Sequence, residues 1–314
     1  MNIRNVIATG CLITILGMAV GPDPVARTLE EKLDSLFIIA SSGYIRFQDQ
    51  VEPAIDSIAA MGAQVTPLLV AKLDSKSARE KWTVNRIITK IGSPAVPHLV
   101  EALSLSDPLM VARVCTSLGD VGDSTAIDPL IGVGRHEKWQ VRSAAVTALG
   151  KIEDTAANEA AMTALHDSVT IVRKSAVVAC GRLGLQQAAP QLVHSLGDRF
   201  YGARLMAIEA LLDLPDTAAV VALLEDSLAS PNALLGHVAC RLLGRYGTDD
   251  ALQLLFEQTG SADPARRAAA AEALLRADPE DLCGFQERVF ERETDPHVLL
   301  KMQSARYDAE HGQP

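Results

Sequence analysis

Apolar residues recur at helical spacing along most of this 314-residue chain. In one stretch the apolar positions fall three, four, seven and eight residues after the first, as one helix face requires: Val141, Ala144, Ala145, Ala148 and Leu149. Alternation of apolar and polar residues, which would predict strands, is not a feature of the sequence. The pattern therefore predicts an all-α protein.

The helical pattern returns at a fixed period. Similar Ala-rich stretches begin at Val141, Val172 and Ala203, so that each copy lies 31 residues after the previous one. Residues typical of helix ends recur at steps of 30 to 32 residues: Gly62, Gly92, Gly122, Glu153, Gly184, Pro215, Gly247 and Asp278. Each period contains two apolar-periodic stretches of about 11 to 14 residues. We therefore predict about nine antiparallel helix pairs stacked into one array.

Charged residues also follow the period. Arginines share one repeat position, with Lys81 there in an earlier repeat: Arg142, Arg173, Arg204 and Arg267. Aspartates precede the matching helices: Asp167, Asp198 and Asp263. On these residues the chain, from about residue 26 to 310, resembles the HEAT-repeat family, in particular the short, Ala-rich bacterial type found in phycobilin-lyase-like proteins. The resemblance implies a right-handed α-solenoid in which Arg and Asp form a structural ladder between repeats, interrupted at Val111 and Gly236.

The N-terminus has a different composition. Arg4 is followed by an uncharged run, residues 6–21, which is short for a membrane span and typical of a secretory signal. Pro22 would hinder cleavage after the small residues before it, so an uncleaved anchor is an alternative. A lipoprotein-type site at Cys11 and an apolar tail from a misassigned start codon are further alternatives.

This difference divides the chain into two parts. We expect residues 1–25 to be a signal peptide or an N-terminal membrane anchor with a short linker, and residues 26–314 to be the solenoid. We further expect a bacterial protein that is exported, either to the periplasm or to the outer side of the inner membrane.

Composition and single residues argue against several chemistries. The formal net charge is −10 and aromatic residues make up 4%, which disfavours nucleic-acid binding. Cys115, Cys180 and Cys240 take repeat positions that other repeats fill with apolar residues, so we interpret them as buried. A single His-Glu pair, at His136, cannot build the two-iron site of HEAT-like hydroxylases. We predict no catalytic residue, no metal and no cofactor.

The remaining candidate is a binding surface. In a HEAT-like array the second helix of each pair lines the concave face, and its outward positions are the predicted partner-binding residues: Trp82, Arg86, Trp139, Lys174, Tyr201, Glu209, His237 and Arg241, with Glu272 at an equivalent position. We interpret the chain as a monomeric, non-catalytic scaffold for a protein or peptide partner. The alternative is an accessory subunit of an enzyme, or a bilin-lyase-like enzyme.

Overall fold

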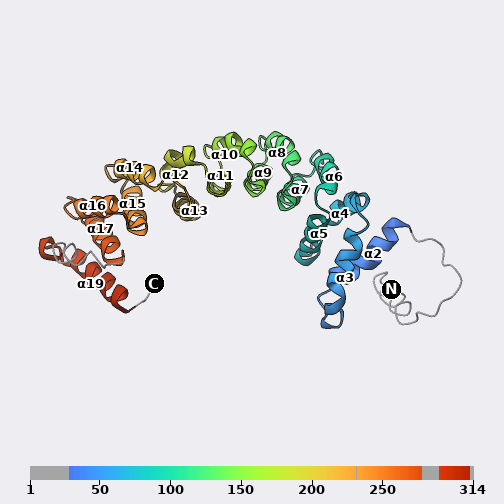
Figure 1. Ribbon diagram of the computed structural model, residues 1–314, viewed down its shortest axis with the longest axis horizontal. Helices are drawn as coiled ribbons and strands as arrows, with labels where there is room; N and C mark the ends of the chain where they lie inside the picture. Colours follow the sequence, from blue (N-terminus) through green and yellow to red (C-terminus); the bar gives the residue numbers. More distant parts are fainter. Residues whose placement is uncertain (1–27, 231, 278–289, 312–314) are drawn as a thin grey trace.

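The computed structural model describes residues 28–230, 232–277 and 290–311. These residues form an arch of two helix layers with no strand among them (Figure 1). The first helices of the pairs form the outer layer: α2 (Leu29–Ala40), α4 (Thr66–Lys72), α6 (Val96–Ala102), α8 (Ile127–Val133), α10 (Asn158–Ala164), α12 (Ala189–Ser195), α14 (Thr217–Leu228) and α16 (Asp249–Gln258).

The second helices line the concave side of the arch, as predicted (Figure 1). They are α3 (Gln48–Ala59), α5 (Ala78–Ile91), α7 (Pro108–Val121), α9 (Trp139–Ile152), α11 (Thr170–Arg182), α13 (Tyr201–Leu212), α15 (Ala233–Tyr246), α17 (Pro264–Arg276) and α19 (Pro296–His311). The all-α solenoid of helix pairs is therefore confirmed. The predicted signal or anchor, residues 1–25, and the predicted helix end at Asp278 lie outside the described residues.

No single helix in the described ranges is long and apolar enough to cross a membrane. One pair of segments, 45–59 and 63–72, meets the length and composition criteria jointly, but it is bent by 101° at the break.

Helix lengths differ between the two layers. From α5 to α17 the second helices have 12 to 14 residues, as predicted, whereas the first helices from α4 to α12 have seven each. The prediction of 11 to 14 residues was wrong for these first helices, because a three-residue 3-10 turn takes up the start of each apolar stretch. Pro67, Pro97 and Pro190 occupy the first turns of α4, α6 and α12, where a missing N–H costs no hydrogen bond.

The predicted helix ends are visible in the backbone. Six of them have positive φ: Gly62, Gly92, Gly122, Glu153, Gly184 and Gly247. Glu153 reaches φ 57° at the end of α9 although it carries a side chain. Pro215 lies in the connection after α13.

The core lies between the two layers and continues along the arch. Leu149 is fully buried, as are Cys115, Cys180 and Cys240. Burial raises the pKa of each of these three thiols to about 12, since a thiolate would be desolvated there. The prediction that these cysteines pack as core residues is confirmed. Cys11 and Cys283 lie outside the described residues.

In four of the described repeats, neighbouring second helices approach almost backbone to backbone at one glycine. A Cβ built on Gly119 would lie 2.7 Å from the Cα of Ala148, and one built on Gly150 would lie 2.6 Å from the Cα of Ala179. Gly181 and Gly244 face Ala210 and Ala273 in the same way, at 2.8 and 3.0 Å from the alanine Cβ. Glycine opposite alanine therefore permits this spacing, and a larger residue at the glycine position would force the helices apart.

We predict that Gly150→Ala destabilises the solenoid by about 1–3 kcal/mol, because the added methyl group meets main-chain atoms that cannot move aside cheaply. The measurement is the urea midpoint, followed by circular dichroism. Gly132→Ala in α8 is the matched control, since a Cβ there meets nothing within 4 Å. It should gain about 0.5–1 kcal/mol from helix propensity. Equal midpoints for the two variants would contradict the close approach.

The arginine ladder forms at the start of the second helices. Arg142 donates from Nε and Nη2 to the Asp167 carboxylate at 2.7 and 2.9 Å, and from Nη1 to the backbone oxygens of His136 and Glu137. Arg173 repeats this arrangement with Asp198, at 3.0 and 2.8 Å. Each arginine thus links the loop of its own repeat to the loop of the next. The Asp167 hydrogen bonds from Arg142 hold the pKa of that carboxyl below its usual range.

Two of the predicted ladder positions were wrong. Asp263 is the N-cap of α17 and accepts from the backbone N–H of Ala265, and Ser261 takes the position of Asp198. Arg204 keeps its backbone contacts to the preceding loop, but no carboxylate in the described residues pairs with it. Arg267 instead pairs with Glu293 at 2.8 Å.

The predicted interruptions of the ladder, at Val111 and Gly236, are present. At Val111 both charged groups of the ladder are missing. Valine replaces the arginine, and His136 occupies the loop position at which later loops have Asp167 and Asp198. At Gly236 the freed space is taken by Arg266, which donates to the backbone oxygen of Ser230 at 3.2 Å.

We predict a coupling free energy of about 0.5–3 kcal/mol between Arg142 and Asp167 in a double-mutant cycle with Arg142→Met and Asp167→Asn. Both side chains are mostly buried, at 15% and 13% exposed, so water screens the pair weakly. The control cycle uses Arg245 and Glu209, which pair at 2.8 Å but are 51% and 50% exposed. That pair should couple by about 0–1 kcal/mol. The reverse order of the two couplings would argue against a structural ladder.

Candidate interaction surface

The predicted partner-binding residues lie at three positions of the second helices. Counted from the N-cap residue, they occupy the first position (Trp139, Tyr201), the fifth (Trp82, Lys174, His237) and the ninth (Arg86, Glu209, Arg241). Their exposure differs: Tyr201 is 66% exposed, Trp82 59% and Trp139 37%, whereas Lys174 and His237 are partly buried.

The structure brings these residues together at the two ends of the arch but not in its middle. Trp82 and Arg86 share a hollow at the N-terminal end. His237 lies near Arg241 and Glu272 at the other end. Trp139, Lys174 and Tyr201 stand on three separate helices, α9, α11 and α13.

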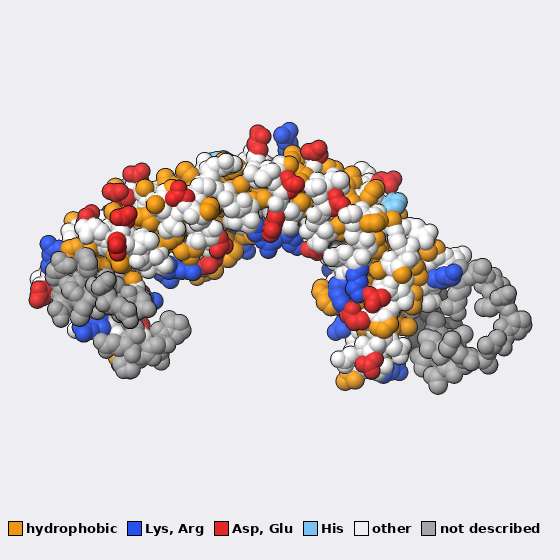
Figure 2. Space-filling view, viewed as in Figure 1, with side chains coloured by type: hydrophobic (Ala, Val, Ile, Leu, Met, Phe, Trp, Pro, Cys, Tyr) orange, Lys and Arg blue, Asp and Glu red, His pale blue; other side chains and the backbone are white. Residues whose placement is uncertain are grey.

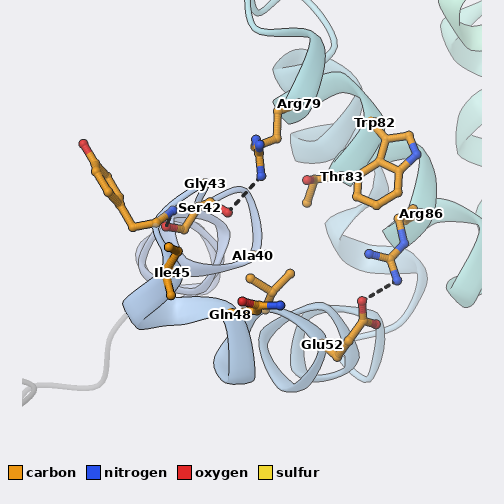
Figure 3. A pocket seen from close by; sticks show the side chains of 12 residues that line it. Ala40, Ser42, Gly43, Ile45, Gln48, Glu52, Arg79, Trp82, Thr83 and Arg86 are labelled. Carbon is orange, nitrogen blue, oxygen red and sulfur yellow. Dashed lines mark hydrogen bonds and ion pairs between the residues drawn. The ribbon is translucent and has the colours of Figure 1, made fainter.

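The hollow formed between α2, α3 and α5 has a volume of about 470 Å³ (Figure 3). We call it the N-terminal hollow, and its lining includes Ser42, Gly43, Tyr44, Ile45, Glu52, Arg79, Trp82, Thr83 and Arg86. On one side the Arg86 guanidinium lies 4.6 Å from the centre of the Trp82 ring, and its Nη2 donates to Glu52 at 2.6 Å. Arg86 is thereby held by a stacking contact and an ion pair together.

Sequence reasoning found Trp82 and Arg86 but missed the opposite wall of the hollow. That wall is the turn between α2 and α3, where Tyr44 and Ile45 are 70% and 88% exposed. This turn belongs to no regular repeat, so the period does not place it. The signal in the sequence was the presence of two large apolar residues, Tyr44 and Ile45, in an otherwise polar turn.

A second hollow, of about 540 Å³, lies between α15 and α17 and contains Arg241, Arg245 and Arg276. Two of these arginines have carboxylate partners: Arg245 pairs with Glu209 at 2.8 Å and Arg276 with Glu272 at 3.4 Å. The arrangement suits polar or acidic contacts more than apolar ones.

Between the two hollows, large apolar side chains are exposed at the beginning of consecutive second helices. We call them the edge row: Leu109, Trp139, Ile171, Tyr201 and Leu234, which lie on α7, α9, α11, α13 and α15 and are 52, 37, 42, 66 and 39% exposed. In the described residues, no large apolar side chain is exposed to this degree on the first helices from α4 to α16. Exposed apolar area therefore gathers on one side of the molecule. In Figure 2, apolar and Lys or Arg side chains appear along the inner rim.

Sequence reasoning included Trp139 and Tyr201 but missed Leu109, Ile171 and Leu234. Those three occupy the second position of their helices, one residue after the position of Trp139 and Tyr201. In a helix with an apolar periodicity, a leucine or isoleucine is easily assigned to the core. Only its distance from the N-cap residue shows that these three side chains are exposed.

His237 is partly buried, and this burial is the main reason that its pKa is lowered from the usual value. Glu272 acts in the opposite direction, whereas Arg241 and Lys301 add to the lowering. The neutral imidazole is thus favoured in the folded chain.

We predict that the solenoid loses stability as the pH falls below about 6.5, because the unfolded chain then binds a proton that folded His237 resists. The stabilisation is present above that pH and disappears below it. The measurement is the urea midpoint at pH 7.5 and 5.5. His237→Gln should show a smaller difference between the two pH values than the parent. His194→Gln, which removes an exposed imidazole, is the control and should behave as the parent; a His237→Gln curve equal to the parent would refute the assignment.

Within the described ranges, no three His, Cys, Asp or Glu side chains come together as metal ligands would. The three cysteines with raised pKa are buried. The acidic residues with lowered pKa form ion pairs or accept hydrogen bonds in turns.

The fold and its exposed concave side define an α-solenoid, a class whose helix pairs present a long, continuous surface. Residues 133–212 and 196–275 match the sequence model of HEAT repeats. Residues 133–275 are therefore HEAT repeats, a fold that protein-interaction scaffolds use. No curated protein matches its sequence closely enough to be counted as a relative.

Several solved structures are similar to this chain. The Escherichia coli protein YibA matches with a TM-score of 0.51 and 15% identity, over 82% of this chain and 96% of that chain. The complex of CpcE and CpcF of phycocyanin lyase from Nostoc sp. matches with a TM-score of 0.40 and 19% identity, over 78% and 94% of the two chains. Human deoxyhypusine hydroxylase matches at 0.36 and 21%, over 81% and 98%. At these identities the likeness concerns the fold alone.

Proposed function

We propose that this chain is a non-catalytic scaffold that binds a protein or peptide along the concave face. The observation that carries the proposal is the edge row, in which five consecutive second helices each expose a large apolar side chain at their first or second residue. Exposed aromatic and apolar residues are the usual anchors of protein interfaces. A partner that runs along the arch could contact successive members of the row, about one helix diameter apart.

The ends of the concave face would add polar contacts to this apolar row. Arg86 and Glu52 in the N-terminal hollow, and Arg245 and Glu209 at the other end, are partly exposed ion pairs, so their charged groups remain accessible to a partner. We also propose that the chain works outside the cytoplasm, in the periplasm or on the outer side of the inner membrane, on the basis of the uncharged run at residues 6–21.

The test replaces Tyr201 by the photoreactive analogue benzoylphenylalanine in the full chain, produced in a bacterial host. We expect a discrete crosslinked protein, recovered in the periplasmic or membrane fraction. The same analogue at Ile38, which is 56% exposed on the outer helix α2, is the control and should give none. Adding Leu109→Ser and Ile171→Ser should weaken the Tyr201 crosslink at least fivefold.

The absence of a crosslink from Tyr201 would refute the proposal, and so would either of two further outcomes. Crosslinking of equal strength from Ile38 and Tyr201 would mean that the concave side is not selective. A pigment that copurifies with the chain in stoichiometric amount would instead favour the lyase-like alternative.

A further inference from the structure

The N-terminal hollow contains a guanidinium, that of Arg79, most of whose N–H donors have no hydrogen-bond partner among the described residues. Arg79 is exposed, and among the described residues its one hydrogen bond is a long one, 3.3 Å from Nη1 to the backbone oxygen of Ser42 (Figure 3). The guanidinium lies against Gly43, where a Cβ would come within 3.1 Å of the Arg79 Cζ. A guanidinium carries five N–H donors, so Arg79 has donors left for a ligand with two oxygens.

A second group in the hollow lacks a partner. The Thr83 side chain is fully buried, and its hydroxyl has no hydrogen-bond partner in the described residues. In Figure 3 this hydroxyl points toward the space between Arg79 and the Ser42–Gly43 turn. A buried hydroxyl without a partner is costly, which is a reason to expect an acceptor from outside the chain. The exposed side chains of Arg79 and Gln48 can shift to admit one.

The rest of the hollow is largely apolar. Ala40 and Val51 line its floor, and the exposed Trp82 ring forms a side wall. The charged lining residues are Arg79, Arg86 and Glu52, and Glu52 is already paired with Arg86. The hollow therefore has a net charge of +1, carried by Arg79, in a chain whose net charge is −10.

We infer that the N-terminal hollow binds the free C-terminal carboxylate of an extended peptide whose last side chain is aliphatic. The carboxylate contacts Arg79 and the Thr83 hydroxyl, and the side chain lies on Ala40 and Val51 beside Trp82. This inference rests on the proposed scaffold function and names the chemistry of one end of the partner.

A chain end suits the hollow better than an internal acidic residue. The C-terminal residue carries its carboxylate and its side chain on one Cα, so a single residue can meet both the guanidinium and the apolar floor. In an extended peptide, neighbouring side chains point to opposite sides, so an internal acidic residue and the apolar residue beside it cannot both enter. A volume of about 470 Å³ is within the range of sites for small ligands.

The experiment measures fluorescence anisotropy of two labelled pools of random hexapeptides with Leu as the last residue, added to the full chain. One pool has a free C-terminal carboxylate and the other a C-terminal amide. We expect the free carboxylate to bind at least tenfold more tightly, since the amide cannot accept the charged hydrogen bonds of Arg79. Equal binding of the two pools, or no binding of either, would overturn the inference.

Variants locate the binding within the hollow. Arg79→Gln should abolish the preference for the free carboxylate, and Thr83→Val should weaken binding of that pool severalfold without lowering the urea midpoint, because it removes a hydroxyl that has no partner. Arg182→Gln is the matched control, since Arg182 is an exposed arginine on the second helix α11, away from the hollow, and it should bind as the parent does. Loss of the preference in Arg182→Gln, or its retention in Arg79→Gln, would overturn the inference.

The peptide assay and the Tyr201 crosslink fail independently of each other. If the pools bind equally while the Tyr201 crosslink persists, the scaffold proposal stands and the hollow has no role in recognising a carboxylate. If the crosslink is absent while the free-carboxylate pool binds, the hollow is a peptide site on a molecule whose edge row is not an interface.

Discussion

The spacing of the second helices depends on a single recurring contact, glycine against alanine. At Gly119, Gly150 and Gly181 the helix backbones nearly touch, so α7, α9, α11 and α13 form the dense middle of the arch. The equivalent position is Thr89 in α5 and Leu212 in α13, and there the next second helix stands farther away (Figure 1). The distance between neighbouring second helices thus depends on the volume of one side chain per repeat.

The arginine ladder contacts the second helices near their N-terminal ends, whereas the glycine contacts lie near their C-terminal ends. Gly150 lies near the C-terminal end of α9 and Arg142 near its beginning, so α9 is fixed at both ends, as is α11 by Gly181 and Arg173. The charged contact is directional and joins loops, whereas the glycine contact is steric and joins helices. At Val111 and Gly236 the ladder lapses but the close packing remains, since Gly119 and Gly244 follow on the same helices. On α13, where Arg204 has no carboxylate partner in the described residues, the glycine is also missing, because Leu212 takes its place.

Periodicity made much of this fold predictable. The positive φ values at Gly62 and Glu153, the concave position of the second helices and the burial of Cys115 all follow from a fixed register. The register did not separate Asp263 from Ser261, because both lie just before α17 and only the hydrogen bonds tell an N-cap from a ladder position. The N-terminal hollow was unpredictable for another reason: Arg79 and the Ser42–Gly43 turn come from different repeats, and the turn has no periodic equivalent.

The repeat also allows surface side chains to vary while the helix packing stays the same. The ninth residue of the second helices is Arg86 in α5, Glu209 in α13 and Arg241 in α15, although the backbone around it is alike. These positions lie outside the glycine–alanine contact and the ladder, so their side chains can change without disturbing either of those contacts. Under the proposed scaffold function, selectivity for a partner would therefore come from positions at which the sequence departs from its own period. The N-terminal hollow combines α5, a helix of a regular repeat, with the turn between α2 and α3, which has no periodic equivalent.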